Sequence, residues 1–163
     1  KRLQLSFDQT GNTSSHRQTG EIMAAELAAL GIECTPILNN NPRFYEKLRA
    51  GKMQLFRLSW IGDYPDPENF LQLFYSKNRS PGPNHSCYAN PEYDAEYEKA
   101  MAAGTDAERM RHWRRCQEIV REDCPWIFTH ITKNYTLSRS RVGNYVPNDF
   151  PYGNEKHYRV QKQ

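Results

Sequence analysis

Two aspartates in the stretch LSWIGDYPDPENFLQLFYS, residues 58–76, are the side chains best placed to do chemistry. Asp63 and Asp66 stand three residues apart, and paired carboxylates are the groups that acid/base catalysis uses. Asp66 has a structural explanation, because an aspartate before a proline can cap the helix that follows. Asp63 follows Gly62, which permits close backbone approach. With Trp60 beside it, Asp63 is suited to hold a ligand cation through a charge-assisted hydrogen bond. An ordinary surface turn explains the same residues about equally well.

The rest of the chain adds no catalytic motif. It lacks the G-x-S-x-G, P-loop, G-x-G-x-x-G and H-E-x-x-H patterns, and its five histidines are dispersed. We therefore predict no cofactor. The 22 basic and 19 acidic residues give a net charge of +3, and they are scattered along the chain. This is no electrostatic footprint for nucleic acid.

Four cysteines, Cys34, Cys87, Cys116 and Cys124, allow three full disulfide pairings and contain no C-x-x-C pair. His112 and Cys116 share one helix face at i and i+4, so they could coordinate a metal together with Cys124. Structural zinc requires four close ligands, usually in two well-spaced pairs, and we predict no metal site. Buried thiols and a single disulfide both explain the cysteines.

The elements that position Asp63 are strands and helices within the first sixty residues. The predicted strands cover residues 2–7, 33–38 and 53–60, and the predicted helices cover 15–30 and 43–51. Ser15 and Gln18 form a capping box at the start of the first helix, and Gly31 is a natural stop after it. Two βαβ units in succession indicate an α/β fold with a largely parallel sheet flanked by helices. Ligands of such sheets bind beyond the carboxyl ends of the strands, where IGDYPDP begins.

The second half of the chain reads as helical and then extended. Asn90 and Thr105 are predicted to cap two helices. Apolar residues at helical spacing predict faces that point into a core: Phe70, Leu73 and Phe74, then Tyr93, Tyr97 and Met101, then Met110, Trp113, Gln117 and Val120. Residues 124–138 read as one or two extended segments, and the tail from Arg141 has no clear periodicity.

Length and polarity suggest one domain that is part of something longer. A chain of 163 residues suits one domain. Its mean hydropathy of −0.91 is polar for a domain that covers itself, which indicates a missing partner surface. No apolar run approaches the ~20 residues that span a bilayer, and no signal peptide precedes Leu3. Because the chain starts at Lys1 with a strand-like pattern, we expect it to be a fragment of a longer protein.

Several segments together carry a resemblance to a known family. FRLSWIGDYPDPENFLQLFYS is similar to the signature of the C-terminal lobe of bacterial ABC-importer oligopeptide- and dipeptide-binding proteins, the class-II periplasmic solute-binding proteins of family 5. AAELAALGIECTPIL, NPEYDAEYEKAM, DAERMRHWRRCQEIVREDCPWI and VGNY resemble further family segments. The likeness spans about residues 3–145 in register.

The resemblance implies a solute-binding protein and not an enzyme. Two lobes close on a peptide; residues 1–140 would form the C-terminal lobe, and residues 141–163 a tail that returns to the N-terminal lobe, absent here. Asp63 would receive the peptide's α-amino group, Trp60 would line a side-chain pocket, Arg57 would face the ligand carboxylate, and Tyr64 would join them. The implied partners are a peptide or other small solute and the permease subunits, in the periplasm or at the outer face of the cytoplasmic membrane.

Three alternatives stay open at this point. A hydrolase would use Asp63 and Asp66 as its carboxylate pair. A protein-interaction module would dock the exposed face of the lobe onto another subunit. Family members also bind nickel complexes, haem, sugars or opines, so the fold does not fix the ligand class.

Overall fold

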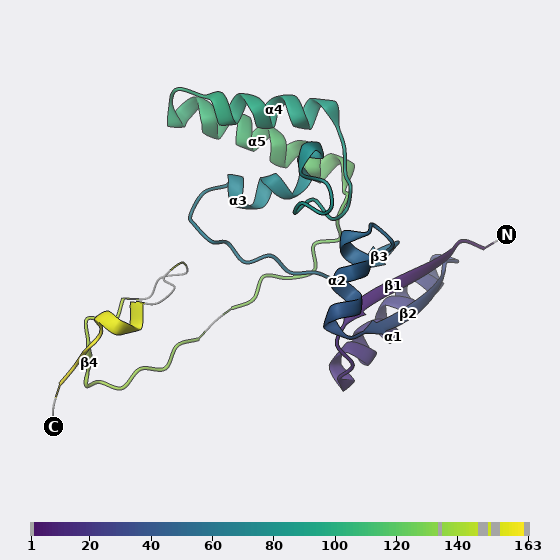
Figure 1. Ribbon diagram of the computed structural model, residues 1–163, viewed down its shortest axis with the longest axis horizontal. Coiled ribbons are helices and arrows are strands. Elements are labelled where there is room, and N and C mark those ends of the chain that lie inside the picture. Colours follow the sequence, from purple (N-terminus) through teal and green to yellow (C-terminus); the bar gives the residue numbers. More distant parts are fainter. Residues whose placement is uncertain (1, 134, 147–149, 151–153, 162–163) are drawn as a thin grey trace.

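The computed structural model describes residues 2–133, 135–146, 150 and 154–161, and it contains a sheet half and a helical half (Figure 1). The sheet half holds three parallel strands in the order β2-β1-β3: β1 is Gln4–Thr10, β2 is Glu33–Asn39 and β3 is Leu55–Phe56. Helix α1 (Ser14–Ala29) connects β1 to β2, and α2 (Asn41–Arg49) connects β2 to β3. The predicted βαβαβ arrangement and the α/β fold class are confirmed.

The two helices cover opposite faces of the sheet. Asp8 and Gln9 are neighbours on β1, so their side chains point to opposite faces. The Asp8 carboxylate pairs with Lys47 of α2. The Gln9 side-chain amide donates to the carbonyl oxygen of His16 in α1 at 2.9 Å. Strands β2 and β3 lie on opposite sides of β1, which makes β1 the switch point of the sheet.

Strand β3 is much shorter than the predicted strand over 53–60. The last ladder bond runs from the backbone N–H of Arg57 to the carbonyl oxygen of Asp8, at 3.1 Å. Beyond it the chain leaves the sheet, because Trp60 donates its indole N–H to Asn69 of the helical half. This long-range bond draws the apolar segment away from β1, and the predicted extent of the strand is wrong.

Helix α1 also departs from its prediction. Its N-cap is Thr13, which makes no side-chain capping bond, so the predicted box of Ser15 and Gln18 is wrong. Ile22 and Leu30 are 62% and 75% exposed, although with Met23 and Leu27 they recur at the helical spacing that predicts a core-facing stripe. The predicted stop is confirmed: Gly31 adopts a φ of +77°, which favours glycine.

The helical half begins with α3 (Glu68–Leu71) and ends with the side-by-side helices α4 (Pro91–Ala102) and α5 (Asp106–Asp123) (Figure 1). Both predicted caps are confirmed. The Asn90 side chain accepts from the backbone N–H groups of Glu92 and Tyr93 at 2.8 and 3.2 Å. The Thr105 hydroxyl accepts from the N–H of Glu108 at 3.3 Å.

A single apolar core holds the helical half together. Its buried members come from α3, the turn after it, α4 and α5: Leu71, Leu73, Phe74, Tyr93, Tyr97, Ala100, Trp113, Cys116, Ile119 and Val120. The predicted core faces are therefore confirmed at most positions. Phe70, Met101, Met110 and Gln117 are exposed, against the prediction. Met101 and Met110 lie at helix positions where the described chain offers no element to cover them, whereas the Phe70 ring is partly covered by Gly62.

The irregular residues 57–67 join the sheet half to the helical half, and a second irregular passage, residues 124–141, leads from α5 to the tail (Figure 1). The second was predicted to be extended, and its described residues form no strand up to 141. The tail contains a short antiparallel pair, β4 (Val142–Gly143) with β5 (Arg159–Val160). That the tail returns to another lobe stays a prediction. No helix among the described residues is both long enough and apolar enough to cross a membrane.

Candidate functional site

The candidate site is the loop between β3 and α3, and Asp66 anchors its end. The Asp66 carboxylate accepts from the backbone N–H of Glu68 at 2.8 Å, so the predicted capping role is confirmed. It also receives two guanidinium bonds from Arg109 of α5, one of them at 3.0 Å. Burial alone raises the pKa of Asp66, but the bonds from Arg109 and Glu68 outweigh it and hold the pKa below its ordinary value. Asp66 is thus an anionic anchor.

This anchoring speaks against the hydrolase alternative. A catalytic acid next to a carboxylate partner needs a raised pKa to keep its proton at neutral pH. The pKa of Asp66 is lowered instead, and its oxygens are engaged by α3 and by Arg109. Asp66 is therefore not suited to be the protonated acid of such a pair.

Asn69 organises the other end of the loop, and the sequence analysis missed it. The side chain is 1% exposed. Its Oδ1 accepts the indole N–H of Trp60 at 2.9 Å and the backbone N–H of Asp63 at 3.3 Å. Glu68 completes the clamp by accepting the hydroxyl groups of Tyr64 and of Tyr97 in α4. The run of polar residues at the start of α3 is the sequence feature that could have indicated this role of Asn69.

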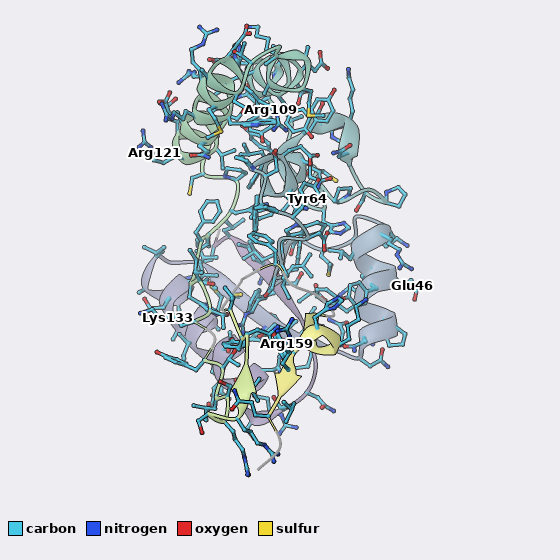
Figure 2. All side chains as sticks on the ribbon, turned by 90° about the vertical axis from the view of Figure 1, so that its left-hand side faces the viewer. Glu46, Tyr64, Arg109, Arg121, Lys133 and Arg159 are labelled. Carbon is cyan, nitrogen blue, oxygen red and sulfur yellow. The ribbon has the colours of Figure 1, made fainter. Side chains whose placement is uncertain are left out.

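The structure brings three of the four candidate residues together on this loop. Trp60 is 36% exposed, and Asp63 and Tyr64 are exposed. Asp63 makes no ion pair with any residue in the described part of the chain. Arg57 lies three residues before Trp60, at the end of β3, and it too is exposed. Figure 2 shows Tyr64 at a level between α5, marked by Arg109 and Arg121, and the sheet half below.

Cavities flank the loop on both sides. Arg57 and Trp60 help to line one of about 600 Å³, beside β3. Tyr64 helps to line another of about 670 Å³, mainly apolar, against α5 and Phe128. Asp63 lines neither cavity and stands between them on the loop. The Asp63 carboxylate is exposed, so a ligand can approach it from solvent.

Gly62 is required by the close approach of two aromatic rings. A Cβ at this position would lie 2.9 Å from Cε1 of Phe150 and 3.1 Å from Cζ of Phe70. Gly62→Ala is therefore expected to lower the free energy of unfolding by about 1–3 kcal/mol through overpacking. Urea unfolding measures this change. Gly104→Ala is the control, since a Cβ there meets no atom within 4 Å; equal losses in both variants would contradict the prediction.

The groups considered for a metal site make other contacts in the structure. The His112 ring contacts Glu96 through Nδ1 and Oε2 at 2.6 Å, and Cys116 is buried in the core. Cys124 is exposed, and all four cysteines are free thiols. The described residues contain no cluster of three or more histidine, cysteine or acidic side chains that could hold a metal ion.

Comparisons with known proteins agree on one family. The model of the bacterial extracellular solute-binding proteins, family 5, matches residues 2–82. Di/tripeptide-binding protein 4 of Pseudomonas aeruginosa is 29% identical over 135 residues, which are 82% of this chain and 25% of the relative. Heme-binding protein A of Haemophilus influenzae is 25% identical over 136 residues, 83% of this chain and 25% of the relative.

A solved structure shares the fold of this chain. The oligopeptide-binding protein AppA of Bacillus subtilis, solved with a nonapeptide, superposes with a TM-score of 0.80 at 16% identity. The match covers 99% of this chain and 32% of that protein. At this identity the likeness shows the periplasmic-binding-protein fold alone. The chain spans about a quarter of the length of the curated relatives it matches.

Proposed function

Since this chain belongs to the bacterial extracellular solute-binding proteins of family 5, we propose that it forms one lobe of the solute-binding component of an ABC importer. The lobe captures a peptide against a second, N-terminal lobe and hands it to the permease without altering it. One observation carries the proposal: Asp63 is an exposed carboxylate without an ion-pair partner in the described chain, on a loop clamped from both ends.

The chemistry of the loop favours a ligand with a free amino terminus. The Asp63 carboxylate accepts a charge-assisted hydrogen bond from the ammonium group, which strengthens when a second lobe excludes water. Trp60 offers an apolar ring to the first side chain, and Tyr64 offers a second aromatic surface. Arg57 faces the ligand carboxylate. One relative is named for di- and tripeptides and another for haem, and the free carboxylate supports the peptide as the ligand of this chain.

The remaining features of the proposal follow from the family. The name of the family supports a location in the periplasm or at the outer face of the cytoplasmic membrane. The ligand is released to permease subunits, and no cofactor takes part. Residues 1–140 form the lobe, and the tail from residue 141 returns to the N-terminal lobe.

Calorimetry with trialanine and N-acetyl-trialanine tests the proposal on the protein as its gene encodes it. The free amine is expected to bind about 30-fold or more tighter, because acetylation removes the charge that Asp63 pairs. Equal affinities would overturn the role of Asp63. Cleavage products in mass spectra of the mixture would support the hydrolase instead. Binding of neither peptide, together with capture of a protein subunit, would favour the interaction module.

A further inference from the structure

Asn69 is a buried polar side chain whose orientation is fixed by its partners. Its Oδ1 receives the indole N–H of Trp60 and the backbone N–H of Asp63. Both partners are donors that cannot accept, so the carbonyl oxygen of the amide must face them. Nδ2 is left buried and without a hydrogen-bond partner among the described residues. Burying the unpaired Nδ2 group costs free energy, whereas Oδ1 of the same side chain accepts two hydrogen bonds.

This acceptor joins the two residues that the ligand is proposed to meet first. Trp60 and Asp63 are three residues apart on an irregular loop, where the backbone alone does not fix their distance. Asn69 holds the ring of one and the backbone of the other to a single atom on α3. The start of α3 is itself fixed to α5, through Asp66 and Arg109. The spacing between apolar wall and carboxylate is thus set by the helical half.

The choice of asparagine over its close analogues follows from charge and shape. A leucine would fill the site without an unpaired donor, but it would leave the N–H groups of Trp60 and Asp63 without a partner. An aspartate would accept both bonds, but it would place a second anion beside Asp63, and like charges disfavour each other's ionised form. Asparagine supplies the acceptor and stays neutral, so the ligand's ammonium group meets one charge at one position.

We propose that Asn69 is a positioning residue for ligand binding, which sets Trp60 and Asp63 at the spacing that an amino-terminal residue requires. The inference rests on the proposed function, and it assigns Asn69 no contact with the ligand. It predicts that loss of the acceptor lowers affinity through the free amine in particular, beyond any effect on folding.

Three variants of the protein as its gene encodes it separate positioning from folding. Asn69→Leu removes the acceptor and keeps the volume, and Asn69→Ala removes the acceptor by truncation. Asn84→Leu is the matched control: Asn84 is 0% exposed and donates to the carbonyl oxygens of Tyr75 and Tyr88 at 3.0 and 2.9 Å, outside the candidate loop. It loses a comparable buried amide without touching Trp60 or Asp63.

Titration with trialanine and N-acetyl-trialanine provides the readout. Asn69→Leu is expected to lower affinity for trialanine about 10- to 100-fold, since two buried donors lose their partner. The ratio between the two peptides is expected to shrink with it. Asn84→Leu should stay within about 3-fold of the unmodified protein. In ¹⁵N spectra, the indole signal of Trp60 should shift in Asn69→Leu and keep its position in Asn84→Leu.

Each result decides the inference. Unchanged affinity and peptide ratio in Asn69→Leu would overturn it, as would an equal loss in Asn84→Leu. If Asn69→Leu does not fold, Asn69→Ala carries the test, and unchanged affinity and peptide ratio there would overturn the positioning role. A failure of the proposed function is distinguishable, because it would show as equal affinity of the unmodified protein for both peptides.

Discussion

Asp63→Asn is expected to lower the affinity for trialanine by about 10²- to 10³-fold and to leave that for N-acetyl-trialanine nearly unchanged. Asparagine has almost the shape of aspartate, and the backbone N–H that binds Asn69 is retained. The substitution therefore removes the charge and keeps the loop. A ligand ammonium group enclosed beside a neutral amide loses its counterion and keeps its desolvation cost. Calorimetry with the two peptides measures the difference.

Glu26→Gln provides the control for net charge. Glu26 is exposed on α1 in the sheet half, and its loss changes the total charge by the same amount as the loss of Asp63. Long-range attraction would make the two variants similar and would vanish at high salt. If Asp63 pairs specifically with the ligand's ammonium group, only Asp63→Asn lowers the affinity at 0.15 M salt and above. Equal losses for the free and the acetylated peptide in Asp63→Asn would show that the carboxylate does not bind the amino terminus.

Local sequence rules predicted the elements of this fold well, because caps and stops are decided within one helical turn. Asn90, Thr105, Gly31 and Asp66 all take the positions that such rules assign. The order of strands and helices followed as well, since two βαβ units leave few alternatives for a parallel sheet. This order of elements was enough to predict that the candidate loop lies at the carboxyl end of β3.

Contacts between distant segments could not be predicted in the same way. Arg109 reaches Asp66 across 43 residues, and no spacing rule links them. Asn69 also escaped, because its helix position gives no sign that its oxygen binds Trp60. Helical periodicity tells which residues share a face, but it does not tell how far the covering element extends. Met101 therefore continues the stripe of Tyr97 and is nevertheless exposed.

Trp113→Ala is expected to lower the free energy of unfolding by about 3–5 kcal/mol, the range for a buried tryptophan. Trp113 is 0% exposed, and its ring packs against that of Tyr97 with centroids 5.2 Å apart. The guanidinium group of Arg109 lies over the same ring, 5.4 Å from its centroid, while it binds Asp66. Loss of the ring therefore opens the core and also frees the side chain that holds the end of the candidate loop. Urea unfolding followed by circular dichroism measures the change in stability.

Trp60→Ala is expected to affect ligand binding more than stability, the opposite of Trp113→Ala. Trp60 is 36% exposed on the loop, so its removal should lower stability by less than about 1.5 kcal/mol. It should nevertheless weaken trialanine binding about 10-fold or more, because an apolar wall and the indole bond to Asn69 are lost together. The core tryptophan would then affect binding mainly through stability, and the loop tryptophan would affect it directly. A Trp60→Ala variant with the stability loss of Trp113→Ala and unchanged affinity would place Trp60 in the core of the fold and outside the binding site.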